Sequence, residues 1–296
     1  MRINQDTFLF YDVDETVTAF STQRHGGVSK GLYESFNVNH YCGDDPKDVL
    51  TNREMLCDYL RIPMDRLVIP HQTHHTEVRQ IDESFLKQDT SVRQQLLEGV
   101  DAVITREKDV CIGVSTADCI PIILYDKEHY ACGAVHAGWR GTVARIVQHT
   151  LKVMNEVFAT DPANVKAVIG PGISLQAFEV GQEVYDAFAD AAFPMEQIAL
   201  KYEKWHLDLP LCNRLQMMDV GVPDDQIHDA AICTYHHTED FFSARRMGIH
   251  SGRIFTAIVL RNGQSSPHCG LDPQSPAVTL SPHCGLEPQS LAVTNE

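Results

Sequence analysis

The sequence predicts a single α/β domain of the mixed (α+β) kind, in which helices flank β-sheets. Short apolar runs alternate along the chain with longer stretches in which apolar residues recur at helical spacing. Hydrophobic residues make up 43% of the 296 residues and charged residues 22%, which is ordinary for a globular protein with a full-sized core. Neither a linker nor a change of composition divides residues 1–262, so we expect one domain over that range.

Five short apolar runs have the length and composition of buried strands. They are Val110–Thr116, Pro121–Tyr125, Tyr130–His136, Lys166–Ile169 and Ile254–Leu260. A sixth strand is expected just after the histidine cluster of residues 71–75.

Three segments predict helices. From Thr142 to Phe158 apolar side chains recur every three or four positions, and Thr142 is the expected N-cap. Phe178–Phe188 has the same spacing. Leu209–Val220 is the third helix, and Gly221 and Pro223 end it because neither residue continues a helix well.

Composition excludes several classes of protein. The 24 basic and 40 acidic residues give a net charge of −16, so the surface repels a phosphate backbone and no nucleic-acid partner is expected. No apolar run reaches the roughly 18 residues of a membrane span, and residues 1–10 lack a signal peptide's apolar stretch. We therefore expect a cytoplasmic protein without a membrane partner. In that compartment, nine cysteines without a C-x-x-C pair argue against a disulfide framework and a zinc ribbon.

The end of the chain carries a repeat. Residues 266–279 read SPHCGLDPQSPAVT and residues 281–294 read SPHCGLEPQSLAVT, at a period of 15 residues. Two copies rich in Pro, Ser and Gly are too few to build a repeat fold. We expect residues 263–296 to form a disordered tail. The His-Cys pair in each copy supplies too few ligands for a stable metal site.

Three separate segments carry residues capable of chemistry. Pro70–Val78 (PHQTHHTEV) holds three histidines, Asp118-Cys119 lies in a turn between two apolar strands, and His136–Gly141 (HAGWRG) joins a strand to a helix. One cysteine and two histidines from such segments could hold zinc or copper with one open position. The residues also fit a Cys119 nucleophile with His136 as its base. A buried thiol with a structural histidine is the third interpretation.

The basic residues and glycines of the chain supply candidate anion-binding groups. Gly138 and Gly141 let the backbone approach a ligand, and Arg140 adds a positive fork. Arg53 and the pair Arg245-Arg246 are further candidates, although an adjacent arginine pair is also common as a salt-bridged surface feature.

Two H-x-E sequences begin at His75 and His237, but neither is followed by P-C-x-x-C. This excludes the standard zinc nucleobase deaminase site.

Taken together, the segments resemble the YfiH-type laccase-domain family, which is also called polyphenol oxidase or multicopper-oxidase-like. The matching stretches are Phe20–Leu32, Gly43–Asp45, Asn52-Arg53, Gln72–His74, Asp101–Thr105, Ala117–Cys119, His136–Gly141, Ile169–Gly172, Phe178–Val184, Leu207–Leu209, Cys233–Tyr235, Phe242–Arg246 and Gly252-Arg253. They follow the family order over roughly residues 8–260. The repeat tail and Lys87–Leu97 have no counterpart in the family pattern.

The resemblance implies a fold similar to the catalytic domain of cytotoxic necrotizing factor and a metal centre. By motif, the zinc or copper ligands are His74, Cys119 and His136, whereas His71 and His75 have no ligand counterpart.

The resemblance also implies a purine nucleoside phosphorylase that acts on adenosine, inosine and S-methyl-5'-thioadenosine and that deaminates adenosine. The expected partners are therefore purine nucleosides and phosphate. Expected catalytic residues are Asp118, as a proton-transfer group or merely a turn residue, Arg140 and Arg53. The expected substrate- and phosphate-binding residues are Arg245, Arg246, Gly138, Gly141 and Gln72.

Two other functions stay open. A laccase-like copper oxidase needs several copper centres with many histidines, and this site offers one Cys and two His. A metal-free Cys-His hydrolase acting in cell-wall quality control would need the Cys119 thiolate but no metal. The oligomeric state is not predicted.

Overall fold

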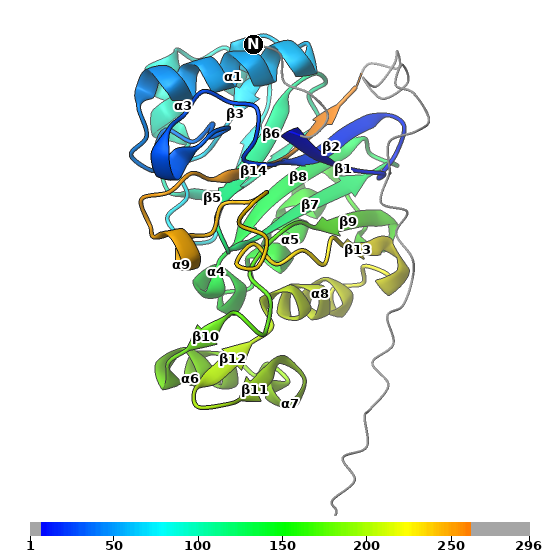
Figure 1. Cartoon of the computed structure of the whole chain (residues 1–296). Coiled ribbons are helices and arrows are strands. Elements are labelled where there is room, and N and C mark those ends of the chain that lie inside the picture. Colours follow the sequence, from blue (N-terminus) through cyan, green and yellow to red (C-terminus); the bar gives the residue numbers. More distant parts are fainter. Residues whose placement is uncertain (1–6, 262–296) are drawn as a thin grey trace, which may run out of the picture.

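Two β-sheets lie face to face, with helices on their outer faces and a third, smaller sheet at one end (Figure 1). The structure is a computed structural model that describes residues 7–261. The mixed α/β prediction is confirmed. The predicted tail, residues 263–296, lies outside the described residues.

The first sheet has five strands in the order β1-β2-β14-β6-β3. These strands are β1 (Phe8–Tyr11), β2 (Val17–Thr22), β14 (Ile254–Leu260), β6 (Cys111–Thr116) and β3 (Leu67–Val68). Helix α1 (Pro46–Leu60) packs its Leu56 and Leu60 side chains against the outer face of this sheet, where Phe20 and Phe255 lie (Figure 1).

The second sheet has six strands in the order β13-β9-β7-β8-β5-β4. These strands are β13 (Ile227–Asp229), β9 (Val165–Ile169), β7 (Ile120–Asp126), β8 (Ala131–Ala137), β5 (Val100–Thr105) and β4 (Glu77–Ile81). Its outer face is covered by α5 (Ile146–Phe158) and α8 (Leu209–Asp219), whose Met154 and Met217 belong to the same buried cluster as Ile122. Short helices α2 (Glu83–Leu86) and α3 (Thr90–Leu96) follow β4.

The space between the two sheets is a core of branched aliphatic side chains. Val114 and Ile258 from the first sheet and Val103 and Ile123 from the second are fully buried there. Strands such as β6, β7 and β8 are buried along their whole length, which explains why the sequence shows them as continuous apolar runs.

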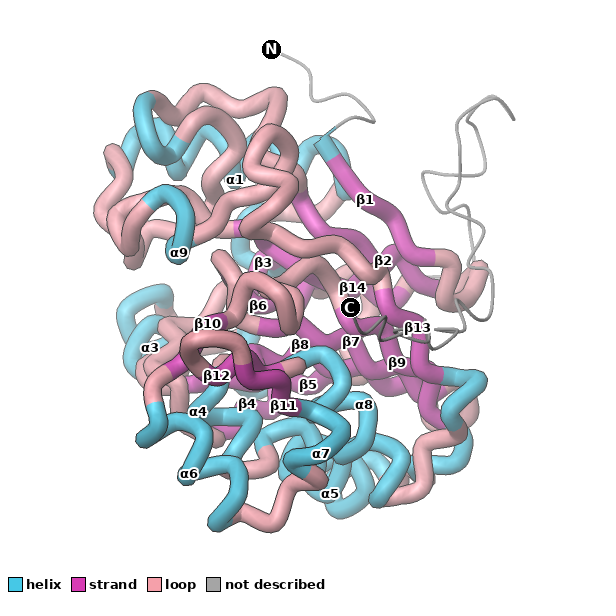
Figure 2. The backbone as a smooth tube through the Cα atoms, turned by 60° about the horizontal axis from the view of Figure 1, so that its bottom comes forward, coloured by secondary structure: helices cyan, strands magenta, loops and turns pink. Residues whose placement is uncertain are grey.

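The third sheet is small and has the order β10-β12-β11. Its strands are β10 (Glu179–Val180), β12 (Trp205–Leu207) and β11 (Ala199–Lys201), and its helices are α6 (Gln182–Asp190) and α7 (Met195–Ile198). Figure 2 shows this unit beside α4 (Trp139–Val143). The short helix α9 (Ala244–Met247) contacts this unit, because Arg245 Nη1 donates to the Glu179 carbonyl of β10.

The predicted strands agree with β6, β7, β8, β9 and β14 to within one or two residues, and β4 follows the histidine cluster as expected. The third predicted helix agrees with α8. Within the described residues, no helix combines the length and the apolar character that crossing a membrane requires.

The prediction of one helix over residues 142–158 is wrong. The helix is interrupted at Arg145, which adopts a left-handed conformation (φ 63°), so α4 and α5 are separate. Thr142 lies inside α4 and is buried, where its hydroxyl accepts a hydrogen bond from the Asn213 amide. The N-cap of α4 is Gly138 and that of α5 is Arg145. Arg145 is held by its contacts with the Ala191 carbonyl and the Phe193 ring.

The prediction of a helix over Phe178–Phe188 is partly wrong. Glu179–Val180 is strand β10, which pairs with β12, and α6 starts only at Gln182 and continues to Asp190. Burial of Phe178 and Val180 places this segment in the sheet, so tertiary packing overrides its helical spacing.

Candidate metal centre

The connectivity of the two sheets explains why three distant segments meet. Strands β3 and β6 are parallel neighbours, so their ends lie at the same edge of the first sheet. The chain crosses from each of them to the second sheet: the β3–β4 connection carries His74, and the β6–β7 turn carries Cys119. In the β7–β8 pair, Pro121 lies opposite His136, which places His136 beside the residues that follow Cys119.

His74, Cys119 and His136 come together as this topology requires. Their potential ligand atoms all lie within 4.8 Å of one another. Cys119 Sγ is 3.8 Å from His74 Nε2, and the two imidazole rings are 4.8 Å apart between centroids. His74 is exposed, Cys119 is partly exposed and His136 is buried, so the group opens to solvent on the His74 side.

Charges inside the group favour a cysteine thiolate. Burial would raise the pKa of the Cys119 thiol, but the charge and hydrogen bond of His136, and then those of His74, outweigh it and lower the pKa to about 6. Burial would lower the pKa of His136, but the Cys119 thiolate and the carboxylate of Asp101 raise it to about 9. Without metal the pair is therefore a thiolate and an imidazolium at neutral pH.

Backbone conformation also serves this centre. His74 has a left-handed φ of 65° and Asp118 a φ of 91°, which are uncommon for residues other than glycine. A Cβ atom on Gly138 would lie 2.9 Å from His74 Cδ2 and 3.0 Å from Cys119 Sγ. Only glycine therefore lets the chain after β8 pass so close to two of the three side chains.

Asp101 belongs to the centre, although the residue-level prediction did not include it. Its buried carboxylate accepts a hydrogen bond from His136 Nδ1 at 2.7 Å. Burial opposes its ionisation, yet the hydrogen bond and charge of His136 keep its pKa below the usual value. The one signal in the sequence is an acidic residue near the start of a mostly apolar strand, in the stretch DAVIT.

Gln72 holds the His74 segment to the first sheet. Its side-chain amide donates to the Ser115 carbonyl and its oxygen accepts from the Ser115 N–H, both at 2.8 Å. Both ends of the side chain therefore bind the last part of β6. These contacts occupy a residue that the sequence predicted to bind substrate.

The Asp118 carboxylate joins the β6–β7 turn to α9. Oδ1 accepts from the Thr234 hydroxyl at 2.7 Å, and Oδ2 accepts from the Arg245 N–H at 2.6 Å. The side chain is 9% exposed. The predicted residues Asp118 and Arg245 are thus in direct contact, and the turn that presents Cys119 is fixed to the helix that presents the arginine pair.

Two further predicted arginines each lie over an aromatic ring. The exposed Arg140 lies over the Trp139 ring, at 4.3 Å. Arg246 lies over the Tyr235 ring, at 5.0 Å. Gly138, Arg140 and Gly141 lie at or next to α4, which has only five residues and contributes little helix dipole.

Arg53 lies on α1, where its Nε donates to the Val38 carbonyl and its Nη2 contacts His40 Nδ1. Tyr41, the next residue, stacks on His71 with 4.1 Å between ring centroids. His71 in turn bonds to Glu98 through Nδ1. Arg53 therefore connects to the His74 segment through an aromatic stack. His71 and His75 are not part of the three-residue group, as the resemblance implied.

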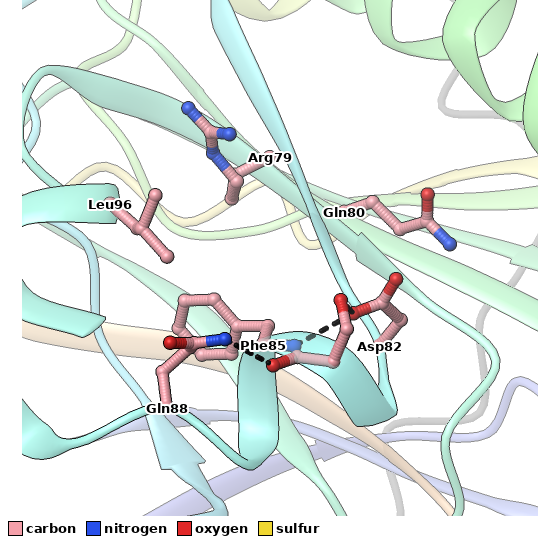
Figure 3. Close-up of a pocket in the computed structure, with 7 residues that line it drawn as sticks. Arg79, Gln80, Asp82, Phe85, Gln88 and Leu96 are labelled. Atoms are coloured by element: carbon pink, nitrogen blue, oxygen red, sulfur yellow. Dashed lines mark hydrogen bonds between the residues drawn. The ribbon is translucent and has the colours of Figure 1, made fainter. Parts of the chain in front are cut away.

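A surface cavity of about 320 Å³ lies elsewhere on the molecule. Figure 3 shows it between β4 and α2, lined by residues such as Arg79, Asp82, Phe85 and Gln88. Its lining includes none of the predicted site residues, and hydrogen bonds to residues of α2 occupy Asp82 and Gln88, which flank that helix. We assign the chemistry instead to the group of His74, Cys119 and His136, which brings together a thiol and two imidazoles.

The side chains of His74, Cys119 and His136 fit a zinc ion. A tetrahedral zinc with ordinary bond lengths separates its sulfur and nitrogen ligands by about 3.5 Å, close to the 3.8 Å between Cys119 Sγ and His74 Nε2. The carboxylate of Asp101 can only accept, so His136 donates through Nδ1 and Nε2 is the nitrogen left for a metal. Three protein ligands leave one position open, as in catalytic zinc sites.

Comparisons with known proteins identify the family to which this fold and these motifs belong. Residues 18–261 match the family model described as "Multi-copper polyphenol oxidoreductase laccase". A purine nucleoside phosphorylase of Bacteroides thetaiotaomicron is 48% identical over 247 residues, 82% of this chain and 92% of that protein. "Adenosine deaminase RL5", from an unknown prokaryotic organism, is 42% identical over 82% of this chain and 94% of its own length. The crystal structure of YlmD from Geobacillus stearothermophilus has a TM-score of 0.81 at 29% identity, covering 88% of this chain and 98% of that one.

Proposed function

Because the chain belongs to the laccase-domain family, whose model matches residues 18–261, we propose that it is a zinc-dependent purine nucleoside phosphorylase with adenosine deaminase activity. Its substrates are adenosine, inosine and S-methyl-5'-thioadenosine. The observation that carries the proposal is the group His74, Cys119 and His136, with its open ligand position, in a chain whose relatives are named for these two activities.

Phosphorolysis transfers the sugar from a base to phosphate. A phosphate oxygen attacks the anomeric carbon of the ribose, the bond from that carbon to the purine nitrogen breaks, and the departing base takes up a proton. The products are the base and ribose 1-phosphate. In the second activity, water replaces the amino group of adenosine, which gives inosine and ammonia.

The chain's own residues supply binding and orientation. When bound, zinc would supply a Lewis acid that stabilises developing negative charge. Arg140, whose guanidinium is exposed next to Gly138, would bind phosphate, with Arg246 and Arg53 as further positive groups. The missing side chain of Gly138 lets the backbone that leads to Arg140 pass close to His74 and Cys119.

For Asp118, the contacts support positioning more than proton transfer. Its two oxygens accept from the Thr234 hydroxyl and the Arg245 N–H. In this role Asp118 holds Arg245 and Arg246 at the edge of the centre, and Gln72 likewise holds the His74 segment. Both residues would then affect catalysis through the groups they position.

The experiment that tests the proposal is product analysis. Purified protein of measured metal content is incubated with adenosine, with and without phosphate, and the products are separated by chromatography. We expect adenine and ribose 1-phosphate only with phosphate, and a smaller yield of inosine in both samples. Cys119→Ala should abolish both reactions and the bound metal. Cys57→Ala, which changes a buried thiol on α1, is the matched control. Unchanged nucleosides in zinc-loaded wild type would contradict the proposal.

One observation favours a second candidate. The thiolate of Cys119 next to a protonated His136 is also the arrangement of a cysteine hydrolase. A chelator separates the two functions, because it would inactivate a zinc enzyme and leave a metal-free hydrolase active. For the copper oxidase, the described residues 7–261 gather one group of three ligands, whereas a laccase needs several copper centres.

A further inference from the structure

Asp101 is a buried carboxylate at the point where two ligand-bearing segments meet. It is the second residue of β5, and its side chain has no exposed surface. Its neighbours Val100 and Ala102 are also fully buried. Removing a carboxylate from water is costly unless hydrogen bonds satisfy its oxygens. The donors around Asp101 therefore indicate the role of this buried carboxylate.

Four donors converge on this one side chain. Oδ1 accepts from His136 Nδ1 at 2.7 Å and from the His74 N–H at 3.0 Å. Oδ2 accepts from the N–H groups of His75 at 2.8 Å and Thr73 at 3.2 Å. Three consecutive N–H groups can point at one carboxylate because His74 is left-handed.

The strand register explains the position. In the antiparallel β5–β8 pair, Ala102 lies opposite Val135, so Asp101 is next to His136 at the end of the ladder. The His74 segment, which comes from the other sheet, then closes over the same carboxylate. Thus one oxygen, Oδ1, bonds both to the ring of one histidine and to the backbone of the other.

We infer that Asp101 is the positioning residue that aligns both histidine ligands for the metal. The inference rests on the proposed metal-dependent function and deepens it. By accepting from His136 Nδ1, Asp101 turns Nε2 towards Cys119 and His74. By holding three N–H groups of the His74 segment, it keeps an exposed ligand in place before the metal arrives.

Asp126 provides a matched control. It is also fully buried, and it also accepts from a histidine Nδ1 (His129, 2.9 Å) and from two N–H groups, those of Glu128 and His129. All its donors lie within three residues along the chain, at the end of β7 opposite to Cys119. It therefore has the chemistry of Asp101 without the connection between ligands.

The first test compares Asp101→Asn with Asp126→Asn. An Asn side chain keeps one acceptor and turns an NH₂ donor towards N–H groups, so one of the two pairs of hydrogen bonds is lost. The zinc Kd is measured by competition with a chromophoric chelator, and the visible spectrum of the Co²⁺ form reports ligand geometry. We expect Asp101→Asn to weaken zinc binding by about 10- to 100-fold and to change the Co²⁺ spectrum. Asp126→Asn should leave both as in wild type.

The second measurement uses the wild-type protein and so does not depend on the variant folding. Amide hydrogen exchange of metal-free protein should show slow exchange at His74 and His75, although they lie in an exposed connection. Exchange at the rate of an unstructured segment would overturn the inference.

The remaining outcomes separate the two claims. Equal zinc affinity and equal Co²⁺ spectra in wild type and Asp101→Asn would overturn the role of Asp101 alone. Failure of wild type to bind zinc or Co²⁺ would contradict the proposed function and, with it, this inference.

Discussion

At the residue scale, Cys119 shows how neighbours set the chemistry of a side chain. Its thiol lies in a turn, and burial alone would raise its pKa and leave it unreactive. The two neighbouring histidines instead lower the pKa to about 6. Burial acts alone on Cys132, whose pKa it raises. The same residue type is thus a buried hydrophobe in one strand and a thiolate, the proposed metal ligand, in the turn between two others.

Alkylation of Cys119 tests this difference. Only the thiolate reacts, so in chelator-treated protein the rate at Cys119 should rise with pH through a midpoint near 6 and level off above pH 7. Mass spectrometry of the Cys119 peptide after timed iodoacetamide treatment measures the rate. In denatured protein the same peptide should show the ordinary midpoint, about 8.5. A midpoint near that value in the folded protein would show that the histidines do not act on the thiol.

Gly138 makes a second prediction at this scale. Gly138→Ala would place a Cβ 2.9 Å from His74 Cδ2 and 3.0 Å from Cys119 Sγ, so one ligand must shift. We expect zinc affinity to fall by at least about tenfold, measured by chelator competition, because a ligand displaced by a few tenths of an ångström no longer fits a tetrahedral ion.

Gly133→Ala, in strand β8, which also carries His136, is the control. There the new Cβ would meet the Ile104 and Met154 side chains at 3.3 and 3.4 Å, and small side-chain shifts can accommodate it. Its zinc affinity should match wild type. Equal affinity in Gly138→Ala would mean that the ligands are free to move apart.

At the element scale, the connections between the two sheets hold His74 and Cys119, and the pairing of the strands brings these connections to one edge. Two crossovers, β3 to β4 and β6 to β7, leave the same edge of the first sheet. The side chains of Gln72 and Asp118 fix these crossovers, one to β6 and the other to α9.

Asp118→Asn tests the role of the second crossover. If Asp118 anchors α9, the variant should raise the KM for phosphate, because Arg245 and Arg246 shift, while kcat falls by less than about tenfold. General acid–base catalysis by a positioned side chain is worth about 10²- to 10⁴-fold. Steady-state kinetics with varied phosphate gives both constants. A loss of kcat of about 10²-fold or more, with an unchanged KM, would contradict the anchoring role and indicate that Asp118 transfers a proton.

The elements that the sequence predicts well are those whose environment is uniform. Strands β6, β7, β8 and β14 are buried on both faces, and burial on both faces leaves a clear apolar run. The helix predictions failed at two places. Arg145 is left-handed and Glu179 belongs to a short strand, and both conformations depend on contacts from distant parts of the chain. Such contacts have no local signal.

The same distinction applies to the site. His74, Cys119 and His136 could be proposed from residue type and motif, and the structure gathers them. Asp101 was not among the predicted site residues because its function comes from the register of β5 with β8 and from a segment of the other sheet. The motif contained it, but only the fold shows four donors converging on it.

At the scale of the whole molecule, the three proposed ligands lie where the connections between the two sheets meet the end of β8. A bound ion would hold the crossovers and the end of β8 together, and the three residues are close enough to share one ion only in the folded state. Zinc at 100 times its Kd stabilises a fold by about 2.7 kcal/mol, which for a domain of this size raises Tm by roughly 5–10 °C. Thermal unfolding with and without zinc should show this rise in wild type and not in Cys119→Ala. An equal rise in both would place the stabilising zinc elsewhere.

The most direct test of the central claim is reconstitution of the metal-free protein. Adenosine and phosphate are supplied, zinc is added stepwise after chelation, and adenine release is measured at each step. The account predicts almost no activity at the start and a linear recovery that ends at one zinc per chain. Full activity in the metal-free protein, abolished instead by alkylation of Cys119, would contradict it and identify Cys119 as a nucleophile.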